Sequence, residues 1–173
     1  TRKIMLDVII ALMPAAIGSV YFFGINALIL ILVCVASAVG AEFLIQKLFK
    51  KDILIGDLSA VVTGILLAFN LPADAPWWVA VFGSIFAIII VKEFFGGIGS
   101  NFMNPALAAR AVLVASWPSI MAVYPSPDGV SGATPLALMK AGSGVGELPS
   151  LVNMFVGDIG GSLGETSALL LLI

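Results

Sequence analysis

The sequence predicts an all-α protein, a polytopic bundle of transmembrane helices. Three observations predict this class: an excess of apolar residues, a series of apolar runs long enough to cross a bilayer, and cations placed between particular runs. Of the 173 residues, 61% are hydrophobic and 10% are charged, and the mean hydropathy is +1.17. Because soluble domains carry about 25% charged residues, much of this apolar surface must face lipid.

The apolar runs define the expected organisation. A transmembrane helix needs about 20 mostly apolar residues. We therefore expect about five to six spans, with helices one to five in residues 1–123, an extracytoplasmic loop over 124–163, and the start of a further transmembrane helix over 164–173. The chain begins without Met and ends inside an apolar run, so we interpret it as a piece of a longer protein. The runs cover residues 4–23, 25–46, 57–71, 77–96 and 104–123, and another begins near residue 165.

The distribution of cations predicts the orientation. The positive-inside rule assigns the side richer in Lys and Arg to the cytoplasm. In a multi-pass protein of the inner (cytoplasmic) membrane, the loop 124–163 then lies outside, and Lys92 and Arg110 fall on or near the inside. The cations that flank the first two runs and set this assignment are Arg2, Lys3, Lys47, Lys50 and Lys51.

The residues that are scarce limit the chemistry. The chain has no histidine and one cysteine, Cys34, so by itself it cannot supply a His-ligated haem, most zinc sites or an iron–sulfur cluster. We interpret Cys34 as a buried apolar residue, although it could share a cluster with another chain. We predict no metal site and no catalytic residue, and the sequence carries no nucleic-acid signal. Any redox chemistry must use a cofactor that needs neither His nor paired Cys.

A polar segment in the expected outer loop is the strongest candidate site. It reads Asp128-Gly129-Val130-Ser131-Gly132-Ala133-Thr134 and is followed by Pro135. Its glycines let another molecule approach the main chain closely, as an enzyme that modifies a hydroxyl would require. Because Gly, Ser, Asp and Pro also dominate ordinary turns, composition alone leaves a plain surface turn as the alternative.

The order of these residues resembles the flavinylation motif Asp-Gly-x-Ser-Gly-Ala-Thr, with no departure. Proteins with that motif carry FMN through a phosphoester to the threonine, and a dedicated flavin transferase moves the FMN from FAD. The resemblance implies that Thr134 is the acceptor. It also implies a recognition sequence formed by Asp128, Gly129, Ser131, Gly132 and Ala133.

Two further stretches resemble the D subunit of the Rnf complex. They are residues 59–78, with Leu71-Pro72 and Trp77-Trp78, and residues 96–110, with Asn104-Pro105. The resemblance implies a membrane subunit of a translocase-type oxidoreductase that couples electron transfer between ferredoxin and NAD to ion pumping. It implies other membrane and peripheral subunits, the flavin transferase and the lipid bilayer as partners, and it admits a second, non-covalent flavin such as riboflavin.

Several alternatives stay open. The homologous B subunit of the sodium-pumping NADH:quinone oxidoreductase shares the motif. A channel or transporter of small solutes would suit short, interrupted helices, and a structural anchor for redox partners is a third possibility. Residues 56–60 and 164–168 both read Gly, acid, x, Ser, Ala and open an apolar run, which indicates either an inverted repeat or common helix capping.

Charged residues inside the apolar runs have two interpretations. Lys92 and Glu93 mark a functional site or else snorkel to the membrane surface. Glu42 has the spacing to pair with Lys47 on one helix.

The dipeptide Asn104-Pro105 also has two interpretations. It starts a helix, or it marks a broken helix at membrane depth. In the second case Arg110 would face a cavity, a flavin phosphate or an acid.

Overall fold

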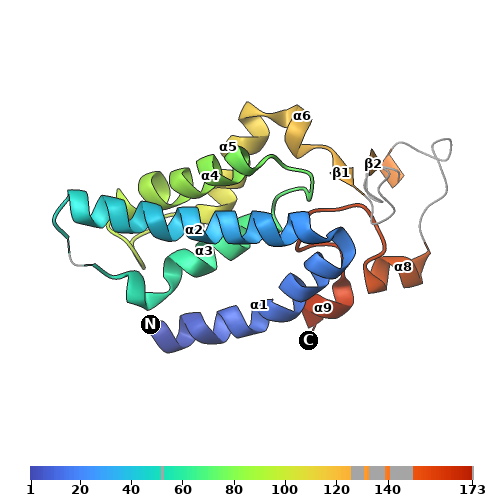
Figure 1. Ribbon diagram of the computed structural model, residues 1–173, viewed down its shortest axis with the longest axis horizontal. Coiled ribbons are helices and arrows are strands. Elements are labelled where there is room, and N and C mark those ends of the chain that lie inside the picture. The colour runs from blue at the N-terminus through green and yellow to red at the C-terminus, as the bar shows by residue number, and fades with distance from the viewer. Residues whose placement is uncertain (52, 126–130, 133–138, 141–149, 173) are drawn as a thin grey trace.

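The computed structural model describes residues 1–173 except 52, 126–130, 133–138, 141–149 and 173. It confirms the predicted all-α bundle, to which one hairpin of two-residue strands is added (Figure 1). The longest elements are α1 (Arg2–Phe23) and α2 (Ile25–Leu48), which meet at Gly24 with φ 71°. Among the described residues, these are the two helices that are long and apolar enough to cross a membrane on their own.

The remaining elements are short. The third apolar run forms an 11-residue helix, α3, and the fourth forms α4, which continues as the π-helix η2. Their bounds are η1 Ile55–Asp57, α3 Ser59–Phe69, α4 Trp77–Ile85, η2 Phe86–Glu93, α5 Pro105–Ser116, α6 Pro118–Met121, β1 Tyr124–Pro125, β2 Ser131–Gly132, α8 Leu151–Val156 and α9 Ala168–Leu172.

The predicted fifth span, residues 104–123, is divided in two. Helix α5 ends at Ser116, and α6 begins at Pro118. The residue before a proline is pushed out of the helical region, and Trp117 accordingly has φ −133° and ψ 63°. The continuous apolar run therefore gives a 12-residue helix followed by a short turn of helix.

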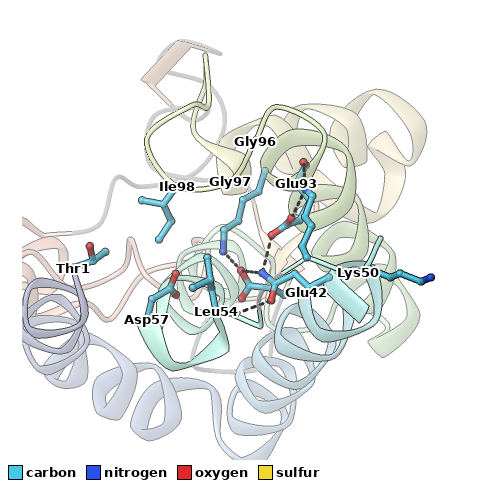
Figure 2. Close-up of a pocket in the computed structure, with 12 residues that line it drawn as sticks. Thr1, Glu42, Lys50, Leu54, Asp57, Glu93, Gly96, Gly97 and Ile98 are labelled. Carbon is cyan, nitrogen blue, oxygen red and sulfur yellow. Dashed lines mark hydrogen bonds and ion pairs between the residues drawn. The ribbon is translucent and has the colours of Figure 1, made fainter. Parts of the chain in front are cut away.

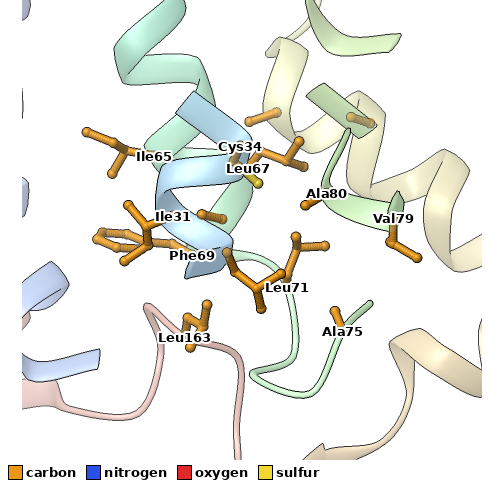
Figure 3. Close-up of a cluster of buried hydrophobic side chains, with 14 of the residues drawn as sticks. Ile31, Cys34, Ile65, Leu67, Phe69, Leu71, Ala75, Val79, Ala80 and Leu163 are labelled. Carbon is orange, nitrogen blue, oxygen red and sulfur yellow. The ribbon is translucent and has the colours of Figure 1, made fainter. Parts of the chain in front are cut away.

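Helix α2 lies at the centre and packs against α3 and α4. Its contact with α3 depends on Gly64, where an added Cβ would lie 2.8 Å from the Cα of Val35. Small residues allow such close approach between membrane helices. Around this contact, Cys34 is fully buried beside Leu67 and other apolar side chains, as predicted (Figure 3).

The bundle has two ends with different chemistry. We call the end with residues 70–76, Tyr124 and 162–165 the loop end, and the end with Lys50, Lys51 and η1 the lysine end. They lie at opposite ends of the long axis, to the right and left of Figure 1. Between them, α1 exposes large apolar side chains, including Ile4, Ile10 and Ile17, as a lipid-facing helix requires.

Candidate functional site

Part of the predicted attachment motif forms a hairpin at the loop end. Strand β2, Ser131–Gly132, pairs antiparallel with β1, Tyr124–Pro125, so that Gly132 lies opposite Tyr124. The other four predicted site residues, Asp128, Gly129, Ala133 and Thr134, lie outside the described residues. The structure therefore gives the base of the motif's loop but does not give the position of the acceptor.

Arg110 lies directly beside this hairpin. Its Nη2 donates to Tyr124 Oη at 3.4 Å, and its Nη1 donates to the Asn70 carbonyl at 3.2 Å and to Asn70 Oδ1 at 2.9 Å. Nη1 is also 3.9 Å from Glu165 Oε1. Of the three partners predicted for Arg110, an acid is therefore present among the described residues.

Arg110 was predicted to lie on or near the inside, the side of the lysines, and this prediction was wrong. Helix α3 has 11 residues, which rise about 16 Å, or roughly half the hydrocarbon thickness of a bilayer. Helix α5 begins beside the start of α3, because Pro105 and Ser59 line one small cavity. Arg110, in the second turn of α5, therefore reaches Asn70 at the end of α3.

The far end of the loop 124–163 is attached to the same place by backbone bonds. The amide of Leu163 donates to the Leu71 carbonyl at 3.1 Å, and that of Gly164 donates to the Phe69 carbonyl at 3.0 Å. Ser19 on α1 donates its hydroxyl to the Leu163 carbonyl at 2.5 Å. Residues 163–164 are therefore held between α1 and the end of α3.

A charged pair is buried at the lysine end. Lys92 Nζ donates to Glu42 Oε1 and to Ser59 Oγ at 2.5 Å, and the Lys92 and Glu42 side chains are 3% and 1% exposed. Of the two interpretations of Lys92, snorkelling to the surface is therefore wrong, and Glu42 pairs with Lys92 rather than with Lys47. The cause is packing, since α2, α3 and η2 meet around the pair and bury both side chains.

The pair continues into a polar network that lines a cavity of about 730 Å³ (Figure 2). Gln46 donates to Glu42 at 3.3 Å and to Glu93 at 3.1 Å. Lys51, which is 44% exposed, pairs with the buried Glu93 at 3.1 Å. Among the described residues, Glu42 Oε2 is a buried oxygen without a hydrogen-bond partner. The network thus joins a fully buried charge to a solvent-exposed one.

Asn104 caps α5, which confirms the helix-start interpretation. Its Oδ1 accepts from the amides of Ala106 at 2.9 Å and Leu107 at 3.3 Å, and Pro105 occupies the first turn. These contacts satisfy amides that a helix start leaves free. Asn104 also lines a cavity of about 190 Å³ together with Ser59 and Lys92.

The two segments of the suspected repeat both precede helices but are capped differently. Asp57 Oδ1 accepts from the Ser59 amide at 2.8 Å, whereas near α9 the Ser167 hydroxyl accepts from the Leu170 amide at 3.3 Å. Glu165, the counterpart of Asp57, accepts from Ser162 at 2.6 Å. The inverted repeat stays a prediction.

Sequence reasoning missed the partners of these charged residues. Asn70, Tyr124 and Glu165 were not singled out as a group, since they are separated by long stretches of chain. Gln46 carried a usable signal, because it is a polar residue one helical turn after Glu42 within an apolar run.

An all-helical bundle with lipid-facing side chains, a buried ion pair and a polar loop fastened at one end defines a polytopic membrane protein. The chain belongs to the NQR2, RnfD, RnfE family, whose sequence profile matches residues 1–173.

Curated relatives carry more specific names. The chain is 58% identical to the D subunit of the Na(+)-translocating ferredoxin:NAD(+) oxidoreductase complex of Acetobacterium woodii, over 100% of this chain and 56% of that protein. It is 40% identical to the D subunit of the proton-translocating ferredoxin:NAD(+) oxidoreductase complex of Clostridium ljungdahlii, over 99% of this chain and 55% of that protein. It is 42% identical to the D subunit of the ion-translocating oxidoreductase complex of Shewanella denitrificans, over 90% of this chain and 45% of that protein. The chain thus spans about half the length of these relatives.

Proposed function

We propose that this chain is the membrane subunit of an ion-translocating complex that moves electrons between ferredoxin and NAD, and that it carries FMN on Thr134. The observation that carries the proposal is the uninterrupted string Asp128–Thr134 in a chain whose relatives are named as subunits of ferredoxin:NAD(+) oxidoreductase complexes. The other subunits supply the donor and acceptor of electrons, and a flavin transferase matures the chain.

The sequence and one described side chain support a phosphoester-linked flavin. The attachment needs a hydroxyl, and the motif offers one at Thr134, two positions after the hairpin residue Gly132 in the sequence. Arg110, whose side chain is 26% exposed, puts a guanidinium beside the hairpin, and guanidinium groups suit phosphate oxygens. When bound, FMN supplies one- and two-electron transfer, and the chain supplies its position and electrostatic surroundings.

The test is the covalent flavin itself. We expect the denatured polypeptide, made in a host with an active flavin transferase, to fluoresce yellow in a gel and to weigh one FMN more than its sequence. Thr134→Ala should abolish both signals, because it removes the only atom to which the phosphoryl group is attached. Ser131→Ala, which deletes the other hydroxyl of the motif, should keep the flavin on Thr134. An unmodified Thr134 in the mature complex would refute the proposal.

The proposed orientation puts the flavin loop on the extracytoplasmic side of the inner membrane. Cys34, the one cysteine in these 173 residues, is buried in the core, so the parent protein labelled in parallel gives the background for the added cysteines. We expect a membrane-impermeant maleimide to label Lys140→Cys in intact cells, and to label Lys50→Cys only after permeabilisation, because Lys140 is exposed in the loop and Lys50 is exposed at the lysine end. The reverse labelling pattern would overturn the orientation.

A second candidate function is that of the quinone-reducing relatives in the same family. The family is named for NQR2 as well as for RnfD and RnfE, whereas the relatives quoted above are named for ferredoxin:NAD(+) or ion-translocating oxidoreductase complexes, which favours the first function. Their names give sodium in one case and protons in another, so the coupling ion is left to measurement. A non-covalent riboflavin is proposed as a second flavin, to be sought by extracting the purified complex with acid.

A further inference from the structure

We propose that Arg110 is a positioning residue that holds the start of the flavin-carrying loop at the end of α3, beside the point where the loop ends. The inference rests on the proposed function for its consequence, but its geometry stands on contacts among described residues. One guanidinium lies within reach of Tyr124, where the loop begins, and of Glu165, just after the loop ends. The same group is bonded to Asn70, at the end of α3.

The contacts with Asn70 make the guanidinium a fixed point. Nη1 bonds both the backbone carbonyl and the side-chain oxygen of Asn70, at 3.2 and 2.9 Å. The side-chain nitrogen of Asn70, Nδ2, in turn donates to the Leu66 carbonyl of α3 at 2.7 Å. The position of Arg110 is therefore set by two helices, α3 and α5, before the loop is considered.

The loop's far end is already held by other bonds. The amides of Leu163 and Gly164 pair with the end of α3, and Ser162 donates to Glu165 Oε2 at 2.6 Å. Glu165 Oε1 then faces Arg110 at 3.9 Å. Since Glu165 is 63% exposed, this ion pair is screened by solvent and contributes little by itself.

The position of the loop's first residues depends on Arg110 more strongly than the position of its last residues. Tyr124 belongs to β1, whose partner strand β2 contains the motif residues Ser131 and Gly132. The bond from Arg110 Nη2 to Tyr124 Oη joins this hairpin to α5. A two-stranded hairpin is at best marginally stable alone. A bond from another element, such as the one from Arg110, is therefore needed to fix the position of the hairpin.

The arrangement uses the forked shape of the guanidinium. Nη1 serves Asn70 and Nη2 serves Tyr124, whereas a lysine has a single nitrogen at the end of a flexible chain. Arg110→Lys keeps the charge but loses the fork. We therefore expect lysine to restore little of the positioning, which distinguishes a geometric role from a purely electrostatic one.

The first experiment measures the loop without flavin. In the whole complex carrying Thr134→Ala, hydrogen exchange is followed in peptides covering residues 124–132 and 162–165. We expect Arg110→Lys and Tyr124→Phe to raise exchange in 124–132. Exchange in 162–165 should stay nearly unchanged in Arg110→Lys and in Glu165→Gln, because the backbone bonds of Leu163 and Gly164 hold that segment and the exposed ion pair contributes little. Lys140→Gln, which removes an exposed cation of the same loop, should change neither. Exchange in 124–132 that is equal in Arg110→Lys and in Lys140→Gln would overturn the proposal.

The second experiment restores Thr134 and measures the flavin. We expect Arg110→Lys and Tyr124→Phe to lower the covalent FMN per assembled complex several-fold, or to shift the reduction potential of the flavin that is attached, with the melting temperature of the complex unchanged. A purely structural role would lower the melting temperature and leave the potential as it is. If Thr134→Ala keeps its flavin, the proposed function fails, while the exchange experiment still decides the role of Arg110.

Discussion

Replacing Lys92 with methionine is expected to destabilise the bundle by about 3–5 kcal/mol, because removal of one partner leaves a buried charge uncompensated. The Glu42 side chain is 1% exposed, and Lys92 is its ion-pair partner. Its second oxygen already lacks a hydrogen bond among the described residues. Methionine fills a similar volume, so the effect reports the lost charge rather than a cavity.

A double substitution separates the charge effect from general damage. Glu42→Gln in the Lys92→Met background removes the stranded carboxylate, so the double variant is expected to be more stable than Lys92→Met alone. Unfolding of the purified chain in detergent, followed by helical circular dichroism, gives the four free energies of the cycle. Additive losses from Glu42→Gln and Lys92→Met would show that the two side chains are not coupled.

Gly64→Ala is the second substitution with a large expected effect. The added methyl would lie 2.8 Å from the Cα of Val35 and 3.0 Å from the Cys34 carbonyl, and these are backbone atoms that cannot move aside. Helices α2 and α3 must then separate, and overpacking of this kind costs about 1–3 kcal/mol. The contact lies in the main core, between the lysine end and the loop end.

Gly40→Ala is the matched control, with the opposite expected sign. Gly40 lies within α2, and an added Cβ there has no described neighbour within 4 Å. Alanine favours the helix over glycine by up to about 1 kcal/mol, so this variant should melt at the same temperature as the parent or higher. Equal destabilisation by Gly40→Ala and Gly64→Ala would contradict the proposed helix–helix contact.

The two ends of the bundle hold different groups. The loop end fastens the segment proposed to carry the redox cofactor, through Arg110 and the backbone bonds of Leu163 and Gly164. The lysine end holds the buried ion pair of Glu42 and Lys92. Helix α3 runs between them, since Ser59 contacts Lys92 at its start and Asn70 contacts Arg110 just past its end. A shift of α3 would therefore change the contacts of Lys92 at one end and of Arg110 at the other.

The sequence by itself determined the class of protein and the candidate acceptor. Apolar composition fixes the solvent of a chain, because hydrophobic surface in this amount needs lipid, and the all-α bundle follows from the need to satisfy backbone groups there. The Asp128–Thr134 string is contiguous, so no folding was needed to read it. Asn104-Pro105 was interpretable for the same reason, since a helix cap is a local interaction.

Tertiary structure alone decided which polar residues meet. Glu42 and Lys92 are 50 positions apart, and Arg110 joins Asn70, 40 positions before it, to Tyr124, 14 positions after it. Local spacing suggested Lys47 for Glu42, which was wrong because the packing of α2, α3 and η2 brings Lys92 to it. The count of spans put Arg110 on the side of the lysines, which was wrong because α3, with 11 residues, is too short to span the bilayer. Burial then selects the pairings, since a charge removed from water must find a partner wherever the packing supplies one.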